Sequence, residues 1–193
     1  MTDVTIILAS GSPRRRELLE QMGVRFEVIT ADVRELDAAS SPQLAPAELA
    51  RENARLKAQA VQARAAGRWV LGADTVVALE GKLFGKPASP DEAAHFLRAL
   101  SGRIHEVVTG CALVDPQGEI EMFNETSRVT FRVLTDGIIA RYLAEVDVLD
   151  KAGAYAVQEK GEWIIERMEG SRANVIGLPV ELLAEVFRRR GLL

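Results

Sequence analysis

The feature that most constrains the fold is an apolar run that ends in small residues and restarts as a basic helix. Val4–Ala9 has the composition of a buried strand, and the small residues Ser10–Ser12 follow it. The second serine of this turn can cap a helix, and Pro13 suits the first helical position. Arg14 and Arg15 then fall in the first helical turn. The stretch therefore predicts a strand, a tight turn and a helix as one unit.

Two arginines in a first helical turn are electrostatically unfavourable, because the helix dipole is already positive there. Each cation costs roughly 0.3 to 1 kcal/mol, and a bound anion removes that cost. Exposed backbone N–H groups, the hydroxyls of Ser10 and Ser12 and the guanidinium of Arg14 together suit a polyphosphate. An ordinary turn between a strand and a solvated basic helix explains the same residues equally well.

Length, composition and charge describe a globular protein. The 193 residues fit one domain over positions 1–193, and 48% hydrophobic with 27% charged residues is globular composition. The net charge of -4 argues against polymeric nucleic acid or an anionic membrane surface as a partner. Cys111 is the only cysteine, which excludes an internal disulfide and indicates a core position in a reducing compartment. Met1–Asp3 has no basic leader character, and no later segment resembles a membrane span, so we expect a cytoplasmic protein.

Hydrophobic periodicity predicts alternating strands and helices along the rest of the chain. Further strands are expected at 24–28, 69–79, 82–84, 105–114, 129–133 and around 164–165. Helices are expected at 13–23, 46–67, 90–100, 136–143 and 179–190, with a long loop over 31–46. The strands at 105–114 and 129–133 are expected to be antiparallel. This order of elements predicts an α/β fold with a mixed sheet, folded as one body or as two lobes.

The helix that starts near position 46 is expected to bury one side. Leu49, Asn53, Leu56 and Ala60 lie on one face of it. Its basic positions, Lys57 among them, are expected to be mostly solvated.

Asp74 interrupts the most apolar strand of the chain, Trp69–Leu79, at its centre. Burying an unpaired carboxylate costs several kcal/mol, so Asp74 must meet a cation, a metal, hydrogen-bond donors or a cleft. With an acidic partner such as Glu35 it could hold Mg²⁺ or Mn²⁺. It could instead take a proton from an attacking water. The residue pattern leaves both roles open.

Several common catalytic sites are excluded by their missing motifs. The two histidines, His95 and His105, lack the spacing of a zinc site, and neither a nucleophile elbow nor a P-loop is present. Carboxylates and basic residues remain. Arg14, Lys57 and Lys86 would clamp phosphates if they converge, although spacing alone favours surface positions for the two lysines.

Five motifs in order along the chain resemble the Maf family. They are Ser10–Arg15, Gly72–Val77, Gly85–Pro87, Ser101–Gly110 and Asp150–Tyr155. The resemblance covers essentially the full length. It implies a cytoplasmic nucleoside triphosphate pyrophosphatase that uses a divalent metal and releases a nucleoside monophosphate and pyrophosphate. It also implies a long twisted sheet with two lobes around a deep cleft, frequent dimerisation, and a link to septum formation and nucleotide-pool cleaning.

The resemblance also implies roles for individual residues. Asp74 matches the proton acceptor of the family, and Arg14, Thr75 and Gln158 match positions associated with substrate choice. Further cleft positions are matched by Glu35, Lys57 and Lys86. Glu35 and Asp74 are the expected metal ligands. Around the central Arg14, Ser10, Ser12 and Arg15 complete the expected triphosphate grip, unless Arg15 is only structural.

The residues in the motifs Gly72–Thr75 and Asp150–Tyr155 resemble the branch of the family that acts on dTTP and UTP more than the branch that acts on 7-methyl-GTP. The amide of Gln158 can pair with a uracil or thymine edge, and Thr75 can add a hydroxyl. Many relatives place glycine directly after this glutamine, whereas this chain has Glu159–Gly161. Modified pyrimidine triphosphates remain an alternative substrate class. A regulator of division that binds a nucleotide without turning it over is the alternative outside enzymes.

Overall fold

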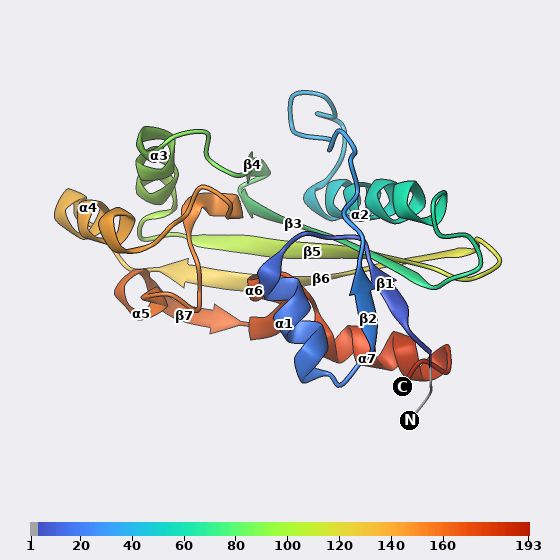
Figure 1. Cartoon of the computed structure of the whole chain (residues 1–193). Coiled ribbons are helices and arrows are strands. Elements are labelled where there is room, and N and C mark those ends of the chain that lie inside the picture. Colours follow the sequence, from blue (N-terminus) through green and yellow to red (C-terminus); the bar gives the residue numbers. More distant parts are fainter. Residues whose placement is uncertain (1–3) are drawn as a thin grey trace.

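Seven strands form one sheet in the computed structural model, which describes residues 4–193 (Figure 1). The strands are β1 (Ile6–Leu8), β2 (Phe26–Val28), β3 (Val70–Leu79), β4 (Lys82–Phe84), β5 (Ile104–Val114), β6 (Ile120–Phe131) and β7 (Ile165–Glu169). Their order across the sheet is β2-β1-β3-β5-β6-β7, and β4 pairs with β3. β1 is parallel to β2 and β3, and the other pairs are antiparallel. The predicted mixed sheet is confirmed.

Helices pack against the sheet and lie at both ends of its long strands. They are α1 (Pro13–Gln21), α2 (Pro46–Gln62), α3 (Pro90–Leu100), α4 (Asp136–Glu145), the 3-10 turn η1 (Ala152–Ala154), α5 (Gly161–Ile164), α6 (Arg172–Ile176) and α7 (Val180–Arg189). α3 and α4 lie at one end of the long strands, whereas α1, α2 and α7 lie at the other (Figure 1). Within residues 4–193, no helix has the length and apolar character needed to cross a membrane. The expectation about Met1–Asp3 falls outside the described residues.

Two sets of buried residues divide the molecule along β3. Val77 and Leu79 pack with α3, α4 and η1 in one core. Leu71 and Ala73 pack with β1, α1 and α7 in another, and a smaller cluster under α2 covers the opposite face of the same end. Because β3 and β5 run through both halves, the two lobes share a continuous sheet. Cys111 is buried in the second core, as predicted.

α2 lies unusually close to the sheet. A Cβ atom built on Gly72 would stand 2.1 Å from the carbonyl oxygen of Ala54, and one on Gly110 would stand 2.4 Å from the backbone nitrogen of Arg51. Small alanines of α2, including Ala54 and Ala58, therefore face the strands. The predicted buried face was partly wrong, because Leu56 and Ala60 are only half buried.

Several boundaries differ from the sequence prediction. β6 starts at Ile120 rather than near 129, because its polar residues are held by pairing along the whole of β5. α5 and α6 were not predicted, since helices of four or five residues form only with tertiary support. α2 ends at Gln62 instead of near Gly67. Ser12 occupies the N-cap of α1, but its side chain accepts no capping hydrogen bond.

Candidate active site

One edge of β3 is open at its centre. β1 pairs with β3 only as far as Leu71, and β4 joins the same edge at Val77. Residues 72–76 therefore have no neighbouring strand on this side among the described residues. Because side chains alternate along a strand, Asp74 and Thr75 point to opposite faces of the sheet. At this gap a ligand can therefore contact side chains from both faces of the sheet.

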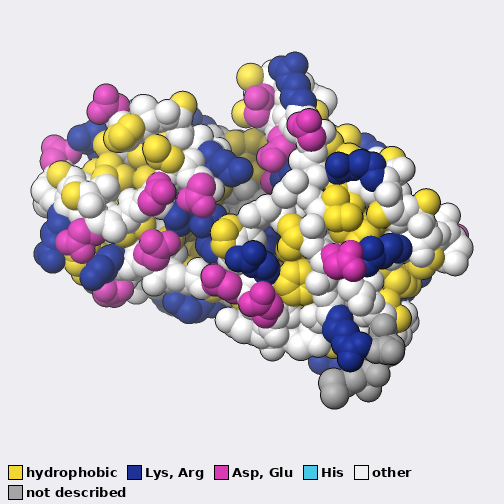
Figure 2. Space-filling model, viewed as in Figure 1, with side chains coloured by type: hydrophobic (Ala, Val, Ile, Leu, Met, Phe, Trp, Pro, Cys, Tyr) yellow, Lys and Arg dark blue, Asp and Glu magenta, His cyan; other side chains and the backbone are white. Residues whose placement is uncertain are grey.

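A cleft of about 1000 Å³ lies at this gap. Figure 2 shows the surface hollowed between the two lobes, with basic and acidic side chains around the hollow. All ten sequence-predicted site residues line this cleft: Ser10, Ser12, Arg14, Arg15, Glu35, Lys57, Asp74, Thr75, Lys86 and Gln158. Residues separated by up to 148 positions in sequence are thus brought together by the sheet and its connecting segments.

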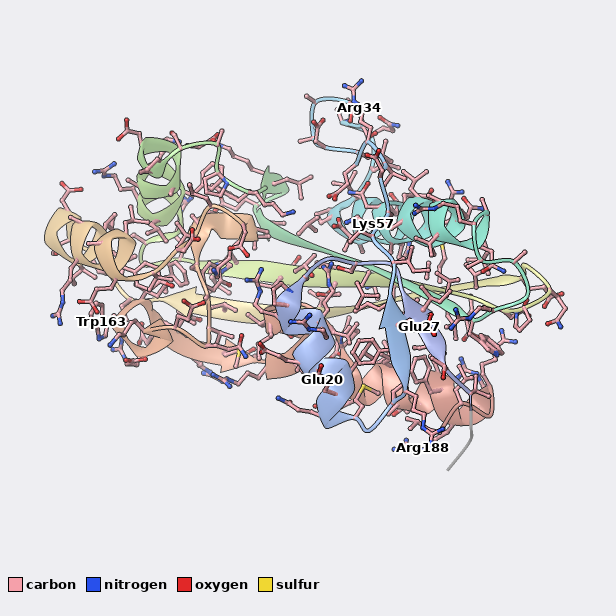
Figure 3. All side chains as sticks on the ribbon, in the orientation of Figure 1. Glu20, Glu27, Arg34, Lys57, Trp163 and Arg188 are labelled. Carbon is pink, nitrogen blue, oxygen red and sulfur yellow. The ribbon has the colours of Figure 1, made fainter. Side chains whose placement is uncertain are left out.

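Asp74 meets a cation and a hydrogen-bond donor from α2. Its Oδ1 lies 2.7 Å from Nζ of Lys57, and its Oδ2 accepts a hydrogen bond from Nδ2 of Asn53 at 3.1 Å. Glu35 reaches the other side of the same ammonium at 3.0 Å. Figure 3 shows Lys57 on the side of α2 toward the middle of the molecule, with Arg34 at the tip of the segment that carries Glu35. The burial requirement placed on Asp74 by the sequence is met.

Lys57 is buried, so its expected solvation was wrong. Its side chain is 10% exposed, like that of Asp74, and it stands between two carboxylates. Position 57 lies one turn after Asn53 and two turns after Leu49 on the inward side of α2, which is why the side chain points into the protein. Two acidic partners compensate the cost of burying the ammonium.

Asn53 ties the loop before α2 to the site. Its side chain accepts a hydrogen bond from the backbone nitrogen of Leu36 at 2.7 Å and donates one to the carbonyl of the same residue at 3.0 Å. Glu35 is thereby held beside Lys57. The sequence showed Asn53 on an apolar helix face, and a polar residue on such a face was the available signal for this role.

Arg14 lies at the start of α1 and crosses to the segment before η1. Its Nη1 donates to Oδ2 of Asp150 at 2.9 Å, while Lys151 contacts the other oxygen of that carboxylate at 2.9 Å. Burial would raise the pKa of Asp150, but the hydrogen bonds from Lys151 and Arg14 bring it below its usual range. The ion pair joins the two walls of the cleft.

Arg15 is buried and binds inside the protein. Its guanidinium donates to the carbonyl of Gly177 at 2.8 Å, to Oγ of Ser10 at 3.0 Å and to Oγ1 of Thr75 at 3.0 Å. Burial lowers the pKa of Arg15, although the charge of Asp74 opposes this effect. Arg15 therefore connects the turn after β1 with β3 and with the end of α6.

Lys86 and Gln158 are exposed on the wall formed by β4 and the segment after η1. The Ser10–Arg14 turn lines the same cleft from the lobe that contains α1. Two buried residues that sequence reasoning missed, Thr109 and Asn174, lie beneath Thr75. Both are polar residues in apolar surroundings, which is the same signal that singled out Asp74.

Oxygen ligands suited to a divalent metal are present but few. Glu35 and Asp74 both contact Nζ of Lys57, so the two carboxylates lie close together, and carboxylates are the ligands that Mg²⁺ and Mn²⁺ prefer. No group of three or more acidic, histidine or cysteine side chains with metal-binding geometry occurs in residues 4–193. The two carboxylates fit a metal that draws its remaining ligands from substrate phosphates and water.

The chain is an α/β protein with a continuous mixed sheet, and its cleft holds a site of paired carboxylates and cations. A HAM1 protein from Coxiella burnetii superimposes with a TM-score of 0.54 at 16% identity, covering 96% of this chain and 99% of that one. The Ham1 protein of Staphylococcus aureus superimposes with a TM-score of 0.50 at 18% identity, covering 96% and 99%. These similarities concern the fold.

The model of the family described as Maf-like protein matches residues 5–190, and the chain therefore belongs to the Maf family. A relative from Akkermansia muciniphila is 50% identical over 91% of this chain and 90% of its own length. Another, from Nitratidesulfovibrio vulgaris, is 47% identical over 96% of this chain and 88% of its own. Both relatives are named dTTP/UTP pyrophosphatase.

Proposed function

We propose that this chain is a nucleoside triphosphate pyrophosphatase that hydrolyses dTTP and UTP to the nucleoside monophosphate and pyrophosphate. The observation that supports it most is the carboxylate of Asp74, held by Lys57 and Asn53 beside the turn that presents Arg14. Relatives at 41–50% identity carry the name of this activity. Modified pyrimidine triphosphates belong to the same proposed substrate class.

In the proposed reaction, Asp74 takes a proton from a water molecule that attacks the α phosphorus. A bond forms between the water oxygen and the α phosphorus, and the bond to the bridging oxygen of the β phosphate breaks. Pyrophosphate leaves with the electron pair of that bond. The hydrogen bonds from Lys57 and Asn53 orient the Asp74 carboxylate for this task.

The remaining cleft residues hold the substrate. Arg14, with the hydroxyls of Ser10 and Ser12, grips the triphosphate, and Lys86 approaches it from the opposite wall. Arg15 supports this grip from below through its bond to Ser10. Gln158 and Thr75 contact the pyrimidine.

The proposed activity depends on a divalent metal, Mg²⁺ or Mn²⁺, with Glu35 and Asp74 as its protein ligands. When bound, the metal neutralises phosphate charge as it develops. We further propose a single domain over residues 1–193, a cytoplasmic location, no polymeric nucleic acid or membrane as partner, and a homodimer.

Assays of pyrophosphate release test this function. The protein is incubated with Mg²⁺ or Mn²⁺ and dTTP, UTP, CTP, GTP or 7-methyl-GTP, and we expect pyrophosphate and monophosphate from dTTP and UTP. Release from 7-methyl-GTP alone would assign the other branch of the family. Nucleotide binding with no pyrophosphate from any substrate would instead support a non-catalytic regulator of septum formation.

The test variant is Asp74→Asn, which keeps the size of the side chain but removes its charge and basicity. It also replaces one acceptor oxygen by an NH2 group, which then faces a donor of Lys57 or Asn53, so the melting temperature of the variant is measured alongside its activity. We expect kcat to fall by roughly 10² to 10⁴. Full turnover in a folded Asp74→Asn protein would show that another group takes the proton.

A further inference from the structure

Thr75 lies at the top of a buried chain of hydrogen bonds. Nη2 of Arg15 donates to Oγ1 of Thr75 at 3.0 Å, and the hydroxyls of Thr75 and Thr109 are 3.0 Å apart. Oγ1 of Thr109 in turn donates to the backbone carbonyl oxygen of Asn174 at 3.0 Å. Thr109 and Asn174 are completely buried, and Arg15 is 9% exposed. Water is therefore excluded from the lower end of this chain, whereas Thr75 itself is half-buried and lines the cleft.

The direction of each bond in the chain follows from its two ends. A guanidinium only donates and a carbonyl oxygen only accepts. The single proton of the Thr109 hydroxyl is used on Asn174, so Thr109 must accept from Thr75. Thr75 thus spends its own proton on Thr109 and one lone pair on Arg15. Oγ1 of Thr75 therefore has one lone pair left, and toward the cleft it can only accept a hydrogen bond.

We propose that Arg15, Thr109 and Asn174 are positioning residues that make Thr75 a hydrogen-bond acceptor toward the bound nucleotide, so that Thr75 selects a ligand with a donor at that point. This inference rests on the proposed function. The N3–H group of uracil and thymine is such a donor, whereas N3 of cytosine carries a lone pair. With cytosine, N3 and Oγ1 of Thr75 would both be acceptors with no donor between them, so cytosine is rejected.

Phosphate oxygens are also acceptors, so this arrangement directs Thr75 to the nucleoside and leaves the phosphates to Arg14 and the lysines. Thr75 and Asp74 lie on opposite faces of β3, and only Asp74 is beside Lys57 and Glu35.

The test compares selectivity rather than activity. Thr109→Val keeps the shape of the side chain but frees the proton of Thr75, which can then rotate and donate to N3 of cytosine. We expect the ratio of kcat/KM for UTP to that for CTP to fall about tenfold. Thr109→Ser retains the hydroxyl and should keep the wild-type ratio. A general loss of folded protein would lower both values of kcat/KM together and leave their ratio unchanged.

A second measurement does not depend on the stability of the variant. Wild-type protein should hydrolyse 3-methyl-UTP, which lacks the N3–H donor, at least tenfold less efficiently than UTP. Equal rates with these two substrates would overturn the inference, as would an unchanged ratio in folded Thr109→Val protein. If the wild-type protein released pyrophosphate from no pyrimidine triphosphate, the proposed function itself would fail, which is a separate result.

Discussion

Individual charged residues in the cleft are held by partners rather than by water. Asp74 and Lys57 each expose about 10% of their side chains, so each depends on the other. Removing one partner of such a pair leaves an uncompensated buried charge and costs several kcal/mol. The ion pair between Asp74 and Lys57 therefore also helps to keep α2 on the sheet.

His105 provides a pH-dependent contribution to stability. Burial lowers its pKa from 6.5 to about 4, and Nε2 lies 2.9 Å from the hydroxyl of Tyr155. The unfolded chain binds a proton at this residue below pH 6.5, whereas the folded protein does so only near pH 4. The contribution is thus complete above pH 6.5 and is lost as the pH falls toward 4, by roughly 2 to 3 kcal/mol.

Urea unfolding at pH 7.5 and pH 4.5 measures this effect. Carboxylates also titrate in this range, so the comparison is made with His105→Gln, which retains a polar partner for Tyr155. We expect the loss of unfolding free energy between the two pH values to be smaller in the variant. An identical loss in both proteins would contradict the assignment to His105.

At the scale of residues, the sequence predicted the side chains that line the cleft better than the buried side chains that hold them in place. The buried charge of Asp74 and the basic turn at Arg14 were visible because each violates a local preference of its strand or helix. For Lys57, the family motifs indicated the cleft correctly, whereas the helical pattern wrongly indicated solvent, since periodicity alone does not say how far a helix sinks toward a sheet. Asn53 and Thr109 were missed because their partners lie on other elements.

Among the secondary-structure elements, α2 has the tightest constraint. Its backbone meets β3 at Gly72 and β5 at Gly110, where no Cβ atom fits. Gly110→Ala should displace α2, lower the free energy of unfolding by roughly 1 to 3 kcal/mol and move Lys57 away from Asp74. We expect lower pyrophosphate release as well as a lower melting temperature.

Gly137→Ala is the matched control for this change. Gly137 lies in α4, where an added Cβ atom would meet Oγ1 of Thr135 at an ordinary 3.8 Å. Alanine is a better helix former than glycine, so this variant should keep full activity and unfold at the same or a slightly higher temperature. Gly110→Ala protein with the stability and activity of wild type would disprove the close packing of α2.

Elements with strong local signals were predicted well. α3 starts at Pro90 after Ser89, whose side chain accepts a hydrogen bond from the backbone of Glu92, as the capping pattern indicated. β6 and α6 lacked such signals. The first part of β6 is defined by pairing with β5, and α6 by the bonds of the buried Asn174 to Val107 and Ser127. Contacts between residues far apart in the chain leave no periodic pattern in the sequence, so α6 and the first part of β6 could not be predicted from it.

At the scale of the whole molecule, a triphosphate would contact both lobes at once, because Arg14 comes from α1 in one lobe and Lys86 follows β4 in the other. A ligand that binds only the folded state stabilises it by about 2.7 kcal/mol at 100 times its Kd. We expect an α,β-imido analogue of dUTP with Mg²⁺ to raise the melting temperature by roughly 5 to 10 °C.

Thermal scans over a range of analogue concentrations measure this shift. Lys86→Met should need more analogue for the same shift, because one wall has lost its cation. The lysine is exposed, so its replacement should leave the melting temperature of the free protein unchanged. No shift at millimolar analogue would argue against a triphosphate site in the cleft.

The continuity of β3 through both cores has a mechanical consequence. Leu71 and Val77 belong to different lobes but lie on one unbroken strand that is paired with β5 throughout. The lobes therefore cannot pivot about a flexible joint. Any narrowing of the cleft has to bend or twist the paired strands, and the hydrogen bonds between β3 and β5 resist this deformation.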